Sequence, residues 1–202
     1  MLFAKAPVVG TVKTRLIPKL GAESAAQLHQ RLVERALQTL VEADVGPVEI
    51  CCAPDTTHPF FAACRQRFGV ALTRQREGGL GERMQAALEV ALAGAPCALI
   101  VGADCPALTV EDVRAARSQL NQWDAAVIAA EDGGYVLIGV RATHPAMFNG
   151  IDWGTATVLA AQRERFRALG WRWHEGAIRW DVDRPADLPR LLELEPPFAF
   201  KQ

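Results

Sequence analysis

The first third of the chain alternates short apolar runs with helical patterns, and this alternation limits the possible folds more than any other feature. Strand-like runs at 2–6, 47–53 and 70–73 are separated by helical spacing at 25–41 and 59–68. A β-α-β-α-β order of this kind favours a parallel sheet with right-handed crossovers. The sequence therefore predicts an α/β fold.

A lone acid follows the most continuous apolar run of the chain. Residues 97–101 are apolar and precede Gly102 and Asp104, which is typical of a buried parallel strand. Open α/β sheets hold their ligands at the carboxyl ends of such strands. A carboxylate is costly there unless a cation meets it, so we expect Asp104 to bind a divalent metal that also carries phosphate oxygens.

A cation-rich loop follows the first predicted strand. Gly10 lies three residues before Lys13, so the Gly-Lys pair of a P-loop is missing. Lys5, Lys13 and Arg15 could together neutralise a di- or triphosphate, with Arg15 able to bind two oxygens at once. A solvated basic turn explains the same residues equally well.

A glycine-rich stretch precedes the helical pattern that begins near Met84. Gly78, Gly79 and Gly81 would let a backbone approach a ligand closely, and the helix N-terminus that follows would favour an anion. A plain connector has the same composition.

Two strand-like runs, 125–130 and 136–140, are joined by too few residues for a crossover helix. The joining segment holds Asp132, Gly133, Gly134 and the only tyrosine, Tyr135. A tight turn would explain the glycines without any function. We interpret the segment as a local reversal of chain direction with a functional site at its mouth.

Two acids near the C-terminus are further candidates for metal ligands. Asp183 stands two residues before Pro185, where a helix N-cap would explain it. No such explanation applies to Asp181. Together they have the oxygen chemistry to complete a site for Mg²⁺ or Mn²⁺ with Asp104.

Composition excludes several functional classes. The chain of 202 residues is long enough for one substantial domain, and we assign 1–202 to it. Its net charge of −1, without a cluster of Lys and Arg, argues against nucleic acid as a partner. No apolar stretch approaches the roughly 20 residues of a membrane span, and the N-terminus does not resemble a secretory signal. We therefore expect a cytoplasmic protein.

Cysteine and histidine add little to the list of candidate sites. The five cysteines form no C-x-x-C pair, and the four histidines show no metal-ligand spacing, so a structural zinc site is not expected. His29 falls on the apolar side of the long predicted helix, which favours a structural role.

Five motifs, in this order, resemble those of a bacterial group of glycosyltransferase-like proteins catalogued as a domain of unknown function. Some members are described as glycosyltransferases of arsenosugar biosynthesis. The similarity runs from Phe3 to Leu192. The motifs are Phe3-Ala4-Lys5-Ala6-Pro7 with Gly10 and Lys13-Thr14-Arg15, Leu80-Gly81-Glu82-Arg83-Met84, Gly102-x-Asp104-x-Pro106-x-Leu108, Asp132-Gly133-Gly134-Tyr135, and Asp181-Val182-Asp183-x-Pro185-x-Asp187-Leu188.

The resemblance implies the nucleotide-diphospho-sugar transferase (GT-A) fold, a three-layer α/β/α sandwich with a mostly parallel mixed sheet. It implies a metal on Asp104, with Asp183 aligning better than Asp181 as second ligand. Family members carry an acid where this chain has Gly79. Any polar contact that this acid makes to the base or ribose of a nucleotide is therefore not expected in this chain. The remaining implied substrate-binding residues are Lys5, Lys13, Arg15, Gly78, Gly81, Arg83, Gly133, Gly134 and Tyr135.

These observations lead to a metal-dependent glycosyltransferase that uses a nucleotide-sugar donor and a small-molecule acceptor. Asp104 and Asp132 would be its catalytic residues, with Asp132 as base or acceptor-binding group. The alternative is a nucleotidyltransferase that releases pyrophosphate from a nucleoside triphosphate, similar to the guanylyltransferases of molybdenum-cofactor and phospholactate metabolism. A non-catalytic nucleotide-binding protein ranks third, and Gly79 keeps it open.

Overall fold

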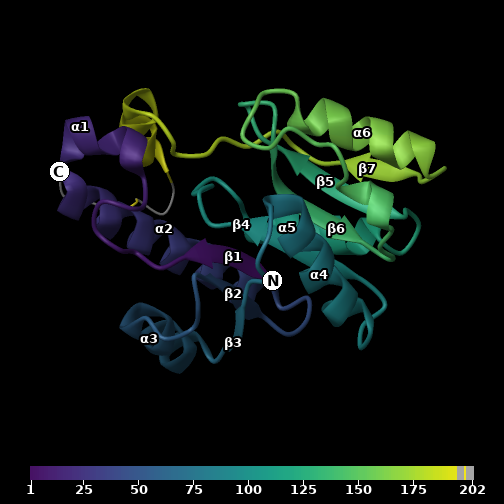
Figure 1. Cartoon of the computed structure of the whole chain (residues 1–202), viewed down its shortest axis with the longest axis horizontal. Helices are drawn as coiled ribbons and strands as arrows, with labels where there is room; N and C mark the ends of the chain where they lie inside the picture. The colour runs from purple at the N-terminus through teal and green to yellow at the C-terminus, as the bar shows by residue number, and fades with distance from the viewer. Residues whose placement is uncertain (195–197, 199–202) are drawn as a thin grey trace.

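The computed structural model describes residues 1–194 and 198, which build three layers around a seven-stranded mixed sheet (Figure 1). The strand order is β3-β2-β1-β4-β6-β5-β7, and only β6 runs antiparallel to its neighbours β4 and β5. The predicted α/β/α sandwich with a mostly parallel sheet is confirmed. The strands are β1 (Leu2–Lys5), β2 (Glu49–Ala53), β3 (Ala71–Arg74), β4 (Ala98–Gly102), β5 (Ala125–Ala129), β6 (Tyr135–Val140) and β7 (Trp173–Glu175).

Helices cover both faces of the sheet, because successive side chains of each central strand point to opposite sides. Along β5, Ile128 packs in the core that includes α2, α3 and α5, whereas Val127 packs in the core that includes α4 and α6. The described helices are α1 (Ile17–Leu20), α2 (Ala22–Ala43), α3 (Pro59–Phe68), α4 (Leu80–Leu92), α5 (Val110–Gln119) and α6 (Val158–Ala168), with short 3₁₀ helices η1 (Thr14–Leu16), η2 (Pro145–Met147) and η3 (Pro185–Glu193).

The helix starts follow their local sequence. Thr109 caps α5 by accepting a hydrogen bond from the Asp112 backbone, and the Asp112 carboxylate accepts one from the Thr109 backbone in return. The two residues thus form a capping box. Pro59 occupies the first position of α3, where its missing N–H costs nothing.

The order of the strands places a crevice beside β1. The chain leaves β1 toward β2 on one side, and β4 is the parallel neighbour on the other side. Such a switch point leaves an open crevice beyond the carboxyl ends of the strands, where α/β proteins hold their ligands. The crevice here lies between the loop after Lys5 and the turn that carries Asp104.

The predicted reversal between β5 and β6 is confirmed. The two strands pair antiparallel from Ala125 with Val140 to Ala129 with Tyr135. Gly133 turns the chain with a φ of +90°, and a Cβ added there would lie 2.1 Å from the carbonyl oxygen of Ala156. Both the backbone angle and the close approach therefore require glycine.

We expect Gly133→Ala to lower the free energy of unfolding by about 3 kcal/mol or more, because backbone strain and overpacking each cost 1–3 kcal/mol. Gly94→Ala is the matched control, since nothing lies within 4 Å of a Cβ at that position. Urea denaturation of both variants measures the difference. Equal stability of the two variants would show that the 132–135 turn is not packed as described.

The C-terminal segment returns across the molecule after β7. Figure 1 shows this yellow segment crossing from β7 toward α1 and α2. Val182, Leu188 and Leu191 pack there against Leu28 and Leu32 of α2. The crossing brings the 181–183 stretch to the crevice between β1 and β4.

The predicted N-cap role of Asp183 is wrong. The helix that follows is the 3₁₀ helix η3, and Pro189 inside it lacks the N–H that a longer α-helix would need. The Asp187 carboxylate accepts hydrogen bonds from the backbone N–H groups of Asp183 and Arg184. The side chain of Asp183 is thereby left to the crevice.

Within the described part of the chain, no helix combines the length and the apolar character that crossing a bilayer requires.

Candidate functional site

The crevice holds a cavity of about 510 Å³, here called the charged cleft. It lies at the carboxyl ends of β1 and β4, under the 11–15 loop and beside the returning C-terminal segment. Of the predicted site residues, the structure brings together Lys5, Lys13, Arg15, Arg83, Asp104 and Asp183 in its lining. Segments distant in sequence thus supply one concentrated set of charges.

Lys13 and Asp104 form the central pair of the charged cleft. The Lys13 Nζ lies 2.8 Å from the Asp104 Oδ1, and the two side chains are 4% and 50% exposed. Lys13 also donates to the carbonyl oxygen of Val182. The backbone of Lys13 is left-handed, with φ of 49°, an uncommon conformation for a residue with a side chain. The Asp104 carboxylate and the Val182 carbonyl oxygen are thus both partners of this ammonium.

His29 is a site residue that sequence reasoning assigned to structure alone. It is buried on α2, and its Nε2 lies 3.0 Å from the carbonyl oxygen of Lys5. Its Nδ1 lies 3.7 Å from Asp104 Oδ1. The position of His29 on the apolar face of a helix indicates that its side chain points inward. Only the tertiary structure shows that Asp104 is its neighbour.

The environment of Asp104 favours its charged form. Burial acts to raise the pKa of this carboxyl, but the Lys13 ammonium and the nearby His29 imidazole outweigh burial and hold the pKa well below its ordinary value. Asp104 is therefore an anion at neutral pH. It can attract a cation or a cationic side chain, and cannot act as an acid.

Arg15 and Asp183 form a second ion pair at the mouth of the charged cleft. The two side chains are 61% and 41% exposed, so the pair contributes little to stability and separates easily. An anionic ligand could take the place of Asp183 and accept two hydrogen bonds from the Arg15 guanidinium.

The far end of the charged cleft is formed by Gln75 and Arg83. The Arg83 Nη1 donates to the Gln75 Oε1 at 2.8 Å, and the Gln75 Nε2 donates to the carbonyl oxygen of Cys51 at 2.7 Å. The Nε of Arg83 is buried and has no hydrogen-bond partner among the described residues. The bond to Gln75 therefore fixes the Arg83 guanidinium at this end of the cleft.

A second cavity adjoins the charged cleft and differs from it in chemistry. This apolar hollow, of about 200 Å³, shares Phe3, Leu80 and Gly102 with the charged cleft. Its other lining residues are mainly apolar, and Asp132 is the only charged residue in the described lining. These other residues include Met84, Asp132, Gly134, Tyr135, Val136, Trp153 and Val158.

Asp132 is exposed at the edge of the apolar hollow. Its Oδ1 accepts a hydrogen bond of 2.9 Å from the backbone N–H of Gly134. The described residues place no cation on this carboxylate. A carboxylate that is oriented by the backbone but not neutralised can accept a proton from a bound molecule.

The remaining predicted glycines support the site from outside its cavities. Gly133 and Gly78 do not appear in the lining of either cavity. Gly81 is buried where a Cβ would lie 3.0 to 3.2 Å from Phe148 and Trp153, so its role is to let α4 approach this wall closely.

Gly79 lies at the N-terminus of α4 and lines neither the charged cleft nor the apolar hollow. Its N–H donates to the Glu82 carboxylate at 2.7 Å. An Asp at this position would be a good N-cap, and glycine costs only a few tenths of a kcal/mol by comparison. The departure from the family pattern therefore leaves the N-cap of α4 without a side-chain acceptor.

Asp181 is half-buried, and the carboxylates of Asp132 and Asp104 lie close enough to affect its pKa. Burial, and then the negative charge of Asp132, raise the pKa of its carboxyl to about 6, and Asp104 adds to the effect. The ordinary pKa of an Asp in an unfolded chain is about 3.9. The folded state therefore binds this proton more tightly, so stability is lost as pH rises from about 4 to about 6.

We expect Asp181→Asn to stabilise the metal-free protein by about 1 to 3 kcal/mol above pH 7, because the amide removes the buried charge. Below about pH 4 the carboxyl is protonated in both states and the difference should vanish. Urea denaturation at the two pH values measures this. A difference independent of pH would contradict it.

The acids of the site do not form a cage for a metal ion. The described residues contain no group of three or more His, Cys, Asp or Glu side chains that could hold one. Mg²⁺ nevertheless often binds through one or two carboxylates and completes its octahedron with water and substrate phosphates. The ionised, half-exposed carboxylate of Asp104 in the charged cleft fits that role. Asp183 lines the same cleft, but Asp104, Asp181 and Asp183 do not form a group of three ligands.

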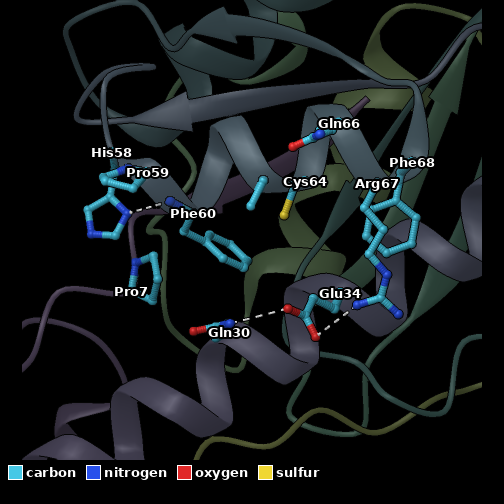
Figure 2. Close-up of a pocket in the computed structure, with 11 residues that line it drawn as sticks. Pro7, Gln30, Glu34, His58, Pro59, Phe60, Cys64, Gln66, Arg67 and Phe68 are labelled. Atoms are coloured by element: carbon cyan, nitrogen blue, oxygen red, sulfur yellow. Dashed lines mark hydrogen bonds and ion pairs between the residues drawn. The ribbon is translucent and has the colours of Figure 1, made fainter.

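A hollow of about 640 Å³, larger than the charged cleft, lies elsewhere, between α2 and α3 (Figure 2). Its polar side chains bond mostly to one another: Gln30 donates to Glu34, and Arg67 lies 3.7 Å from the same carboxylate. Burial raises the pKa of the Cys64 thiol at its floor to about 12, so this thiol is not a nucleophile. Volume alone does not make this hollow the functional site.

Several solved structures share this architecture. A candidate nucleotide-diphospho-sugar transferase from Desulfovibrio desulfuricans G20 is 33% identical, with a TM-score of 0.82 over 91% of this chain and 80% of that one. A nucleotidyl transferase from Methanothermobacter is 13% identical, with a TM-score of 0.65 over 95% of both chains. The 4-diphosphocytidyl-2C-methyl-D-erythritol synthase of Anaerococcus prevotii DSM 20548 is 8% identical, with a TM-score of 0.60 over 94% of both chains.

The last two proteins share the fold with this chain. Their sequence identity is too low to indicate a shared function. A search of curated proteins found no match. The model of a family described as "uncharacterized protein conserved in bacteria" (DUF2064) matches residues 25–155, more than half of the chain. This protein therefore belongs to that bacterial family, as its five sequence motifs indicated.

Proposed function

We propose that this protein is a glycosyltransferase that binds a nucleotide-sugar in the charged cleft and transfers its sugar to an uncharged hydroxyl compound in the apolar hollow. The observation that carries the proposal is the pairing of two adjoining cavities with opposite chemistry. One presents Lys13, Arg15 and Asp104, and the other presents a single carboxylate, Asp132, among apolar walls. The name of the Desulfovibrio relative is consistent with this activity.

The charged cleft would bind the diphosphate. Lys13 and Arg15 each pair with a carboxylate in the absence of ligand, and phosphate oxygens would replace those partners. Asp104, released from Lys13, would hold Mg²⁺ or Mn²⁺. A divalent ion bound there would supply charge neutralisation for the departing diphosphate. Gln75 and Arg83 would bind the nucleoside at the far end of the cleft.

Asp132 would act as the base. The acceptor oxygen forms a bond to the anomeric carbon of the donor while its proton passes to the Asp132 carboxylate. The bond between the anomeric carbon and the diphosphate oxygen breaks, and the nucleoside diphosphate leaves with the electron pair. Lys13 and Arg15 would stabilise the negative charge that grows on this leaving group.

The alternative, nucleotidyl transfer, fits the apolar hollow less well. Forming a nucleoside-diphosphate sugar from a triphosphate uses a sugar phosphate, an anionic nucleophile that displaces pyrophosphate. The described lining of the apolar hollow contains no Lys or Arg, and its one charged group is the acid Asp132. An anion would be repelled there, whereas a neutral alcohol would find a proton acceptor.

A thermal-shift panel of nucleotide-sugars and nucleoside triphosphates, with and without Mn²⁺, tests the proposal. A ligand at 100 times its dissociation constant should stabilise the protein by about 2.7 kcal/mol. We expect nucleotide-sugars to give metal-dependent shifts. If neither class of ligand stabilises the wild-type protein, the proposal is wrong.

Arg15→Met should weaken the best ligand about 10- to 100-fold, because charge-assisted hydrogen bonds contribute roughly 1.5–3 kcal/mol. Arg141→Met is the matched control, since this exposed arginine follows the far end of β6, at the opposite edge of the sheet. Isothermal titration of both variants gives the affinities. Equal weakening by both changes would place the diphosphate elsewhere.

A further inference from the structure

The apolar hollow is small and offers few polar partners. Its volume of about 200 Å³ is less than half that of the charged cleft, about 510 Å³. The Oδ1 of Asp132 already accepts the Gly134 N–H, which leaves the second oxygen of this carboxylate for a ligand. A ligand in this hollow must therefore be compact and needs only one hydrogen-bond donor.

The hydroxyl groups of Tyr135 and Thr155, two other polar groups of the lining, are already occupied. Tyr135 directs its hydroxyl to the buried side chain of Gln162, at 3.4 Å, and burial raises the pKa of this phenol. The Thr155 hydroxyl donates to the carbonyl oxygen of Asp152 at 2.7 Å. Tyr135 thus contributes the face and edge of its ring to the hollow, and Thr155 contributes little hydrogen-bonding capacity.

Trp153 closes one side of the apolar hollow. It also lines a neighbouring cavity of about 430 Å³, here called the outer hollow, which is formed by residues around Phe148 and Gly81. The indole packs against Phe148 and Tyr135, with ring centroids 6.0 and 6.4 Å apart. Trp153 therefore belongs to the wall between a small cavity and a larger one.

We propose that the acceptor is a compact, uncharged alcohol with an apolar body and one hydroxyl group, and that Trp153 limits its length. This inference rests on the proposed glycosyl transfer and adds the chemical class of the acceptor. A sugar or polyol would bury several hydroxyls against apolar walls, and each unpaired one costs about 1–3 kcal/mol. The single hydroxyl of such an alcohol meets the free oxygen of Asp132, and its apolar body meets the rings of Phe3, Tyr135 and Trp153.

Ligand-observed NMR with free alcohols tests the inference without a donor. We expect benzyl alcohol and cyclohexanol to bind with dissociation constants on the order of millimolar, as suits so few atoms, and glycerol and glucose to give no signal. Binding of the polyols in preference to the compact alcohols would overturn the inference.

Trp153→Ala should join the apolar hollow to the outer hollow. The variant should then bind 4-phenylbutanol at least about tenfold better relative to benzyl alcohol than the wild type does. Trp123→Ala, which changes a tryptophan that stacks with Arg172 outside both hollows, should leave that ratio unchanged. An unchanged ratio in Trp153→Ala would show that Trp153 does not set the length.

The two proposals fail in different ways. If compact alcohols bind but no nucleotide-sugar does, the inference about the ligand of the apolar hollow stands and the glycosyltransferase proposal is wrong. If a nucleotide-sugar binds and polyols are the better acceptors, the transfer reaction stands and the inference about acceptor class is wrong. Mass spectrometry of the glycoside formed from each alcohol distinguishes these cases.

Discussion

Asp104→Asn should lower kcat/KM for sugar transfer at least about a thousandfold. The carboxylate is the proposed ligand of the divalent ion, whose charge is expected to contribute several kcal/mol to transition-state stabilisation. An amide oxygen is uncharged and binds such an ion far more weakly. Steady-state release of nucleoside diphosphate from the best nucleotide-sugar, with and without Mn²⁺, measures the effect, and the variant should lose its dependence on Mn²⁺.

The same change also affects stability, and a second variant separates the two effects. Lys13 is almost fully buried against Asp104, so Asp104→Asn leaves its charge unpaired, at a cost of about 2 kcal/mol given the half-exposed partner. Adding Lys13→Met removes the orphaned charge and should restore the stability without restoring activity. Asp124→Asn, at the opposite edge of the sheet before β5, is the control for activity. Full activity in a folded Asp104→Asn protein would contradict the assigned role.

Asp132→Asn should lower kcat by about 10² to 10⁴, the usual contribution of a general base, while donor affinity changes less than twofold. The side chain is exposed and has no cation partner among the described residues. An Asn oxygen can still accept the Gly134 N–H, so the turn should keep its shape. Single-turnover kinetics and isothermal titration of the donor separate chemistry from binding.

Glu131→Gln is the matched control for Asp132→Asn. Glu131 is the adjacent acid, and its two oxygens accept hydrogen bonds of 2.7 and 2.9 Å from Arg190. Removing the negative charge of Glu131 should change kcat less than twofold. If Asp132→Asn weakens donor binding as strongly as it lowers kcat, Asp132 belongs to the donor site and is not the base.

The layers of the fold could be predicted because local patterns determine them. Apolar runs and helical spacing located the elements to within a few residues, as with the run at 97–101, which became β4, Ala98–Gly102. The reversal after β5 was predictable because Asp132, Gly133 and Gly134 leave no room for a crossover helix. The alternation of β5 side chains between two cores follows from strand geometry alone.

The site could be predicted only where each residue follows a strand end. The carboxyl ends of parallel strands meet at one edge of the sheet, which places Lys13 near Asp104 and both near the reversal. The direct contact of Lys13 with Asp104 was not predictable, because it depends on the left-handed turn at Lys13. The contacts of His29 and Trp153 could not be predicted either. Periodicity indicates that a side chain points inward, but it does not identify the residues that the side chain contacts.

The central claim is tested most directly by the phosphorus products of a single reaction mixture. The protein is incubated with Mg²⁺, a nucleotide-sugar, a nucleoside triphosphate, a sugar 1-phosphate and benzyl alcohol, so that both reactions have their nucleophile. The phosphorus products are followed by ³¹P NMR, and the glycoside is measured by mass spectrometry. Glycosyl transfer predicts a nucleoside diphosphate formed from the nucleotide-sugar, in amounts equal to the benzyl glycoside. Pyrophosphate released from the triphosphate, with the nucleotide-sugar left intact, would contradict the account and identify a nucleotidyltransferase.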